Sequence, residues 1–188
     1  MAYASLADLT TYLGIDESTA DDGLLSQLLA RAQAAIDTYT RRTFEATADV
    51  TRWHTLGNVW GRQLTFDGDL CAITSIVNGD GATVAASEYH TLPFNRTPYY
   101  AVELWRDSVT AWDADSGGQI AVTGRWAYSV TPPADIAHAC VRLAAWMYRQ
   151  KDNTAGDTPI IAGDVTILPA RFPSDVQMML APYRRAVL

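Results

Sequence analysis

The sequence predicts an α+β protein: a small bundle of about four helices with an antiparallel β-rich region inserted between the second and third helices. Two periodicities predict this fold. Apolar residues recur at three- and four-residue steps before residue 44 and after residue 132. Between them the period approaches two, and turn signals separate short runs rich in Val, Ile, Thr and aromatic residues. We expect three segments, 1–44, 45–131 and 132–188, with the first and last forming one bundle.

Two helices are expected in the first segment. Ser5 followed by Asp8 is a capping box, and Gly14 ends the short helix that it starts. Asp21 or Asp22 then caps a longer helix, whose acidic first turn complements the helix dipole. One face of this helix is apolar and is expected to face the core: Leu24, Leu25, Leu28, Leu29, Ala32, Ala35, Ile36 and Tyr39.

The middle segment reads as an antiparallel sheet or a small sandwich. Asp67-Gly68-Asp69 has the composition of a turn, and Pro93 and Pro98 mark a loop. The expected strands are 51–56, 62–66, 73–77, 83–85, 100–105 and 119–125.

The last segment begins with a helix after Pro132 and Pro133, where a missing N–H costs little. Its apolar residues are Ile136, Cys140, Leu143 and Met147, in 4-3-4 spacing. A polar connection at 151–163 and one short strand within 164–168 should follow. The last helix opens at Pro173 and runs through Leu180. Pro182 should break it and leave residues 183–185 projecting.

Composition excludes several classes of protein. The 188 residues carry a net charge of −7 and contain no apolar run of the length that a membrane span needs. An acidic chain does not hold DNA tightly, although an acidic wall lets DNA slide past. Residues 1–40 contain six acids against Arg31, whereas 132–188 contain five acids and six bases. Cys71 and Cys140 fit buried free thiols in a cytoplasm.

The sequence shows no catalytic, metal or cofactor site. His54, His90 and His138 lie far apart without acids or cysteines at ligand spacing. Residues 113–117 begin like a calcium loop, but its twelfth position is Gly124 rather than Glu, so a hairpin turn is the better interpretation. Asp67 and Asp69 could in principle serve a glycosidase, yet their spacing is first of all that of a turn. We expect a protein that is not an enzyme.

Aromatic residues are abundant, with six Trp and nine Tyr. Most tryptophans fall in the strand region, where aromatic side chains commonly fill the core of a thin sheet. They could also form a sugar-stacking platform or a protein interface. Trp60, beside Gly57, Asn58 and Gly61, is expected in a loop as an exposed anchor.

Five motifs in order resemble the head–tail connector (adaptor) proteins of tailed bacteriophages. They are Leu9-x-x-Tyr12-Leu13-Gly14, Tyr39-Thr40-x-Arg42-x-Phe44, Val122-x-Gly124-x-Trp126-x-Tyr128, Pro132-Pro133-x-Asp135-Ile136-x-x-Ala139 and Pro182-Tyr183-Arg184-Arg185. Ala127 stands where the pattern has Gly.

The resemblance implies a structural virion protein that assembles as a ring, usually of twelve copies, beneath the portal. The ring would extend the DNA channel and dock the next neck or tail protein, and the chain would be made in the bacterial host's cytoplasm. The residues that fit portal binding are Arg171, Phe172, Tyr183, Arg184, Arg185 and Leu188. Those that fit an acidic lumen are Asp16, Glu17, Asp21 and Asp22. DNA would pass without specific binding, and no membrane is involved.

Other hypotheses remain open. A carbohydrate- or ligand-binding β module is favoured by the Trp-rich middle segment. A hydrolase that uses Asp67 or Asp69 is a distant third. Within the virion class, a stopper or tail-completion protein is the nearest rival.

Overall fold

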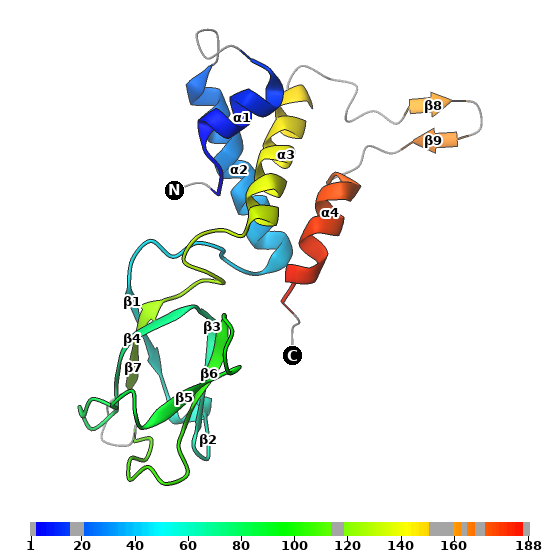
Figure 1. The fold of residues 1–188 in the computed structure, drawn as a ribbon. Helices are drawn as coiled ribbons and strands as arrows, with labels where there is room; N and C mark the ends of the chain where they lie inside the picture. Colours follow the sequence, from blue (N-terminus) through cyan, green and yellow to red (C-terminus); the bar gives the residue numbers. More distant parts are fainter. Residues whose placement is uncertain are drawn as a thin grey trace. The chain divides into compact units, whose positions relative to one another are not determined.

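The computed structural model describes residues 3–15, 21–113, 119–150, 160–162, 165–167 and 172–185. The chain divides into two compact units. The first, here called the helical unit, comprises Met1–Arg41 and Pro133–Leu188, and the second, the β unit, comprises Arg42–Pro132. The predicted fold class is confirmed, since antiparallel strands lie between the second and third of the four helices (Figure 1).

The helical unit contains α1 (Leu6–Leu13), α2 (Asp22–Thr40), α3 (Ala134–Gln150), α4 (Ser174–Leu180) and the 3₁₀ turn η4 (Ala181–Tyr183). Its caps are those predicted. Ser5 and Asp8 form the capping box, and Gly14 ends α1 in the left-handed conformation with φ 68°. The Asp21 carboxylate accepts a hydrogen bond from the Leu24 N–H at 3.0 Å, which leaves one fewer unpaired donor at the start of α2.

The core of the helical unit is formed by the apolar faces that the helical spacing predicts. Its fully buried side chains include Leu9, Leu25, Ile36, Ile136, Leu143 and Leu180. Cys140 is also buried in α3, and burial raises the pKa of its thiol to about 12. Both cysteines are free, as expected, and the raised pKa makes Cys140 an inert core residue.

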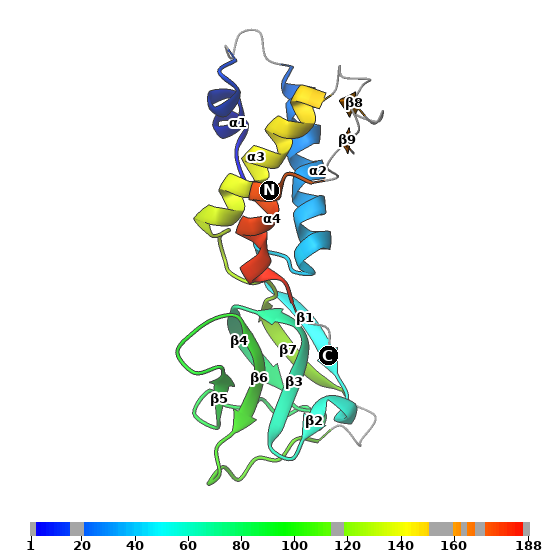
Figure 2. The same cartoon turned by 90° about the vertical axis from the view of Figure 1, so that its right-hand side faces the viewer.

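The β unit is built from two antiparallel sheets (Figure 2). One sheet has the order β1-β7-β4 and the other the order β2-β3-β6-β5. The strands are β1 (Val50–His54), β2 (Val59–Trp60), β3 (Gln63–Leu70), β4 (Ala72–Val77), β5 (Tyr89–Leu92), β6 (Tyr99–Leu104) and β7 (Ile120–Arg125), with the 3₁₀ turn η2 (Leu56–Asn58) before β2.

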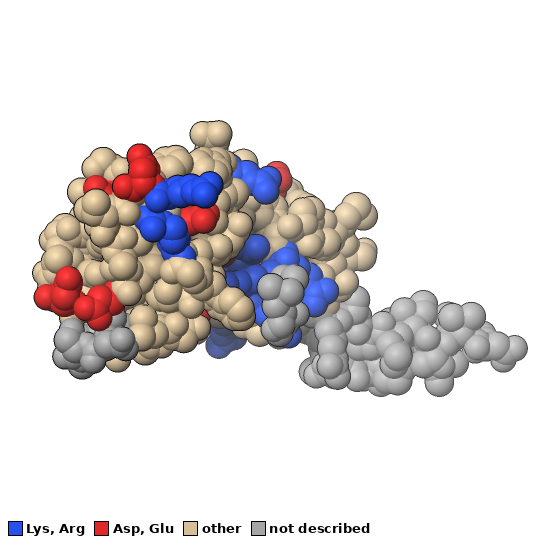
Figure 3. Space-filling view, turned by 90° about the horizontal axis from the view of Figure 1, so that it is seen from below, with Lys and Arg blue, Asp and Glu red and all other residues tan. Residues whose placement is uncertain are grey.

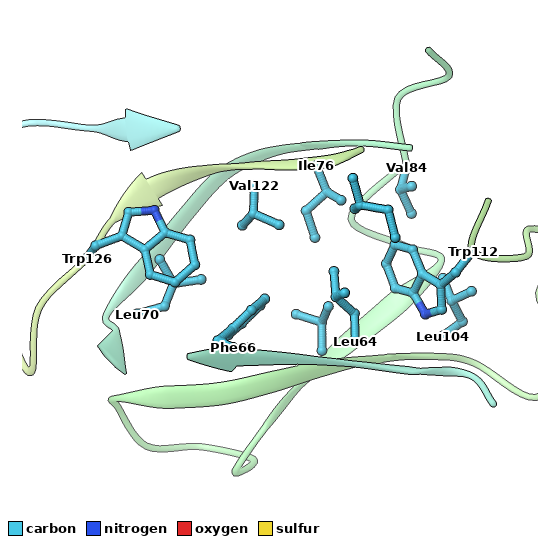
Figure 4. Packing of buried hydrophobic residues seen from close by; sticks show 11 residues of the cluster. Leu64, Phe66, Leu70, Ile76, Val84, Leu104, Trp112, Val122 and Trp126 are labelled. Atoms are coloured by element: carbon cyan, nitrogen blue, oxygen red, sulfur yellow. The ribbon is translucent and has the colours of Figure 1, made fainter. Parts of the chain in front are cut away.

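The two sheets enclose one apolar core. Ile76 and Val122 point from one sheet toward Leu64 and Phe66 of the other, and Trp126 and Trp112 lie toward opposite ends (Figure 4). Each buried tryptophan also satisfies its indole N–H: Trp126 donates to the Val50 carbonyl at 2.9 Å, and Trp112 to the Arg62 carbonyl at 2.7 Å. The unit is therefore a small β-sandwich, one of the two architectures that the spacing predicted.

In the β unit, one predicted turn and one predicted strand were wrong, and two strands were missed. The segment Asp67-Gly68-Asp69 is not a turn, because β3 continues through it, with an irregular register against β6 between Thr65 and Leu70. Residues 83–85 form no strand, and only Thr83 makes an isolated bridge, to Val77. Strands β2 and β5 were not predicted.

A short hairpin lies between α3 and α4. Its strands are β8 (Ile160–Ala162) and β9 (Val165–Ile167), which pair antiparallel. The single strand expected within 164–168 corresponds to β9, whereas β8 falls where a polar connection was expected. Across the described residues, no helix combines the length and the apolar character required to cross a bilayer.

Candidate assembly surfaces

The C-terminal segment, residues 172–185, packs against helices α2 and α3 of the helical unit. The break at Pro182 is confirmed, since α4 gives way to η4 there. The prediction that residues 183–185 project is wrong. The Arg185 N–H donates to the Thr40 carbonyl at 2.9 Å, and the Tyr183 hydroxyl donates to an Asp135 carboxylate oxygen at 3.3 Å. The last carbonyls of a helix lack intrahelical partners, and the returning chain supplies one to α2.

Tyr39 is the centre of these contacts. The Phe172 ring stacks on the Tyr39 ring with centroids 5.5 Å apart and planes 13° apart. The Arg184 guanidinium carbon lies 5.2 Å from the same ring centroid. An ion pair of 2.8 Å between Arg142 of α3 and Asp175 of α4 adds a second attachment. We call the contacts of Phe172, Tyr183, Arg184 and Arg185 with α2 and α3 the C-terminal latch.

The two ends of α2 carry opposite charges. Exposed Asp21 and Asp22 mark its start, and exposed Arg41 and Arg184 lie at its end. A helix of 19 residues is about 28 Å long, so the two groups of charge are well separated. Of the other residues proposed for these surfaces, Asp16, Glu17, Arg171 and Leu188 lie outside the described residues.

The tryptophans of the β unit divide between core and surface. Trp112 and Trp126 are buried, whereas Trp53 is 63% exposed and Trp60 is 77% exposed. The predicted exposure of Trp60 is confirmed, but Trp60 lies in β2 rather than in a loop. On the face of the molecule seen in Figure 3, charged side chains gather in a few clusters and uncharged residues cover most of the described surface.

One aromatic cluster escaped the sequence reasoning. Strand pairing places Trp60 beside Gln63, Gln63 beside Glu103 and Glu103 beside His90. These residues form one row across the sheet β2-β3-β6-β5. Phe94 and Trp105 flank the His90 ring, with centroid distances of 4.5 and 4.3 Å. Only strand pairing brings these residues together, so the signal available in the sequence was their aromatic character alone.

The residues considered for chemistry have structural partners. Asp69 forms an ion pair of 2.6 Å with Arg42, and Asp67 lies 3.9 Å from Arg52. His54 is buried against the rings of Phe66 and Trp126, which also contact each other. No group of three metal-ligating side chains occurs within the described part of the chain. Residues 114–117 of the calcium-like segment lie outside that part.

A helical bundle that carries a β-rich insertion is the architecture that the resemblance to connector proteins implies, and the chain has it. The family model of phage gp6-like head-tail connector proteins matches residues 3–60, from before α1 to the end of β2. The resemblance read from the motifs is therefore confirmed independently in this part of the chain. A comparison with curated proteins finds no match.

Solved structures extend the similarity of fold to nearly the whole chain. A chain in the virion of a native gene transfer agent particle is 20% identical, with a TM-score of 0.62. Chains in the neck of an empty particle, computed with C6 symmetry, and in the neck of a native particle, computed with C12 symmetry, are each 18% identical, with TM-scores of 0.59 and 0.60. Each alignment covers 97% of this chain and 89% of the other.

Proposed function

We propose that this chain is a structural virion protein, a head–tail connector that forms a ring beneath the portal, extends the DNA channel and docks the next neck or tail protein. The observation that carries the proposal is the fold shared over 97% of the chain with proteins from particle necks. The connector-family match over residues 3–60 supports it. The work of the protein is assembly rather than catalysis.

The ring is proposed to contain twelve copies. Two of the similar chains come from necks computed with C6 and C12 symmetry. A ring needs two different complementary faces on each subunit. Each subunit binds the next one head to tail, and the repeated rotation between neighbours closes the ring. The opposite charges at the two ends of α2 offer one such pair of faces.

The C-terminal latch residues Phe172, Tyr183, Arg184 and Arg185, with neighbouring Arg171 and Leu188, are proposed to bind the portal. Aromatic and arginine side chains are the types that dominate binding energy when they fill pockets in a partner. Portal binding would exchange the Tyr39 contacts of the latch for such pockets. The acidic residues Asp16, Glu17, Asp21 and Asp22 are proposed to face the lumen, where they repel phosphate so that DNA passes without specific binding.

The proposal is tested by cryo-electron microscopy of the full chain mixed with the portal protein from the same genome. The expected result is a ring at the narrow end of the portal, with residues 171–188 in contact with it. No complex at low and at physiological salt would overturn the proposal. A ring that binds one layer further from the portal, on another neck protein, would assign the chain to the stopper or tail-completion class instead.

A ligand-binding β module is the second candidate, because Trp60 is 77% exposed at one end of the row that leads to His90, Phe94 and Trp105. This candidate predicts that a glycan array binds the full chain and that Trp60→Ala abolishes the binding. Trp53→Ala, which removes a ring from the other sheet that is 63% exposed, is the matched control. Portal binding without any glycan signal would reject the candidate.

A further inference from the structure

The hairpin β8–β9 is a sheet of two strands. Its register joins Ile160 to Ile167, Ile161 to Thr166 and Ala162 to Val165. Among the described residues, neither strand pairs with any strand other than its hairpin partner. Within the described part of the chain, each strand therefore has one paired edge and one edge without a strand beside it. A lone two-stranded hairpin is only marginally stable in water, so a further strand on either side would stabilise it.

The sequence of the hairpin does nothing to protect these edges. The strands read Ile-Ile-Ala and Val-Thr-Ile, which are mostly β-branched residues, without Lys, Arg or Pro. Native proteins commonly block open edges with charged side chains, proline or bulges, because an open edge is a template for pairing with another chain. The hairpin thus has the composition of strands that are paired in the working assembly.

The register identifies the main-chain groups that are free to pair. Ala162 and Val165 are separated by two residues, the loop length of the tightest hairpins. The pair that closes such a hairpin exchanges hydrogen bonds, and pairing alternates along antiparallel strands. The N–H and C=O groups of Ile161 and Thr166 therefore point outward, one set on each edge.

We propose that β8 of one copy pairs with β9 of the next copy, so that the hairpins join neighbouring subunits of the ring. This inference rests on the proposed connector function. Pairing of β8 with β9 uses two different edges, so it is heterologous and repeats from copy to copy. Pairing of β8 with β8 would stop at a dimer and leave both β9 edges open. A closed ring of hairpins leaves no open edge.

The dimensions of such a ring are compatible with a channel. Twelve copies would supply two strands each, and strands lie about 4.8 Å apart, which gives a circumference of about 115 Å and a backbone diameter of about 37 Å. Strand tilt would widen it further. Barrels of about 16 to 18 strands already enclose an aqueous channel, so this larger ring of strands stays open.

Proline substitutions test the edges without disturbing the hairpin. Ile161→Pro and Thr166→Pro each remove one outward N–H, and proline is tolerated on an edge where the N–H does not bond within the sheet. In the full chain mixed with the portal protein, we expect at least a tenfold loss of rings by negative-stain microscopy for either variant. Ile161→Val and Thr166→Ser, which keep the N–H, should assemble like the wild type. Unchanged circular dichroism would verify that the variants fold.

Cysteine cross-linking identifies what occupies the edges. The single variants Ile161→Cys and Thr166→Cys, assembled together into mixed rings and oxidised, should give covalent dimers on a non-reducing gel. The two cysteines are placed on separate chains because Ile161 and Thr166 face each other within one hairpin. The wild type is the control, since its free Cys71 and Cys140 are buried. Dimers from either single variant alone, loss of rings in the proline variants without dimers in the mixed rings, or normal rings in both proline variants would each overturn the inference. If the wild type forms no ring, the connector function itself fails.

Discussion

At the scale of single residues, His54 is a buried histidine whose protonation is unfavourable inside the β-sandwich. Its ring is 2% exposed, its Nε2 has no hydrogen-bond partner in the described structure, and Phe66 and Trp126 pack against it. Burial lowers the pKa of His54, and the Arg52 guanidinium lowers it further, while the Asp67 carboxylate opposes both. The neutral imidazole is therefore the form that the fold accommodates.

A pH dependence of stability follows from this environment. Because the folded-state pKa of His54 lies below the unfolded value of about 6.5, the unfolded chain takes up the proton first as the pH falls. The contribution of neutral His54 is fully present above about pH 6.5 and is lost progressively below it. We expect the urea midpoint of the β unit, followed by tryptophan fluorescence, to fall as the pH is lowered below about 6.5.

The matched variants isolate the residue. His54→Leu should flatten the pH dependence in this range, and His138→Gln, which changes an exposed histidine in α3, should leave it as in the wild type. An equal slope in wild type and His54→Leu would assign the effect to other groups.

At the scale of elements, the motif glycine Gly124 explains how β4 meets β7. A Cβ at this position would lie 2.1 Å from the Ala72 carbonyl oxygen, beside the register shift between Ile73 and Ser75. Ala127, the departure from the family pattern, is buried with Ala46 and Cys71. A small side chain is accommodated there, so the departure leaves the packing intact.

Gly124→Ala should destabilise the β unit by about 1–3 kcal/mol, the usual cost of overpacking. Gly124 lies in the central strand of its sheet and the clash is with the backbone of the neighbouring strand β4, so no side-chain rotation relieves it. The measurement is the free energy of urea unfolding. Gly57→Ala is the control, because its Cβ would make an ordinary 3.4 Å contact with Thr55, and it should change stability by less than about 0.5 kcal/mol.

The C-terminal latch is a second element with a testable role. Tyr39→Leu removes the ring on which Phe172 stacks and Arg184 lies, and aromatic and cation–π contacts together contribute about 1.4 kcal/mol. Amide hydrogen exchange in residues 174–185 should accelerate about tenfold, while exchange in α3 stays unchanged. Tyr39→Phe keeps the ring and should behave as the wild type. Equal exchange in all three proteins would show that Tyr39 does not hold the segment.

At the scale of the whole molecule, net charge limits what the protein can hold. With a net charge of −7, the chain gains little from releasing the counterions of DNA. We expect no retardation of duplex DNA in gels between about 50 and about 200 mM salt. A dissociation constant below about 10⁻⁶ M would contradict both this expectation and the proposal of an acidic lumen that DNA passes without binding.

How much of the fold could be predicted from the sequence depends on how far apart along the chain the interacting residues lie. Helix starts and ends depend on neighbours a few residues away, so the Ser5–Asp8 box, Gly14 and the Asp21 cap were all found. The extension of β3 depends on pairing with β6 and on Arg42, 27 residues before Asp69. A rule based on neighbouring residues cannot include a partner this far along the chain. The turn-like composition of Asp67-Gly68-Asp69 therefore gave a wrong prediction.

The candidate surfaces show the same division. The exposure of Trp60 could be predicted from its glycine-rich surroundings, but the cluster of His90 with Phe94 and Trp105 needed the β5–β6 register. Proline at 182 predicted a break in the helix. It did not predict that the chain returns to Thr40, because that contact spans most of the sequence.

The two ends of the β unit are fastened to each other. The Tyr128 N–H donates to the Thr43 carbonyl at 2.8 Å, and the Ser129 hydroxyl donates to the Phe44 carbonyl at 3.1 Å. The sandwich is thus a closed cassette whose entry and exit strands lie side by side. The loops of the β unit can therefore change in length without altering the sequence of α2 or α3. Surfaces presented by the β unit can change in this way while the helical unit keeps its sequence.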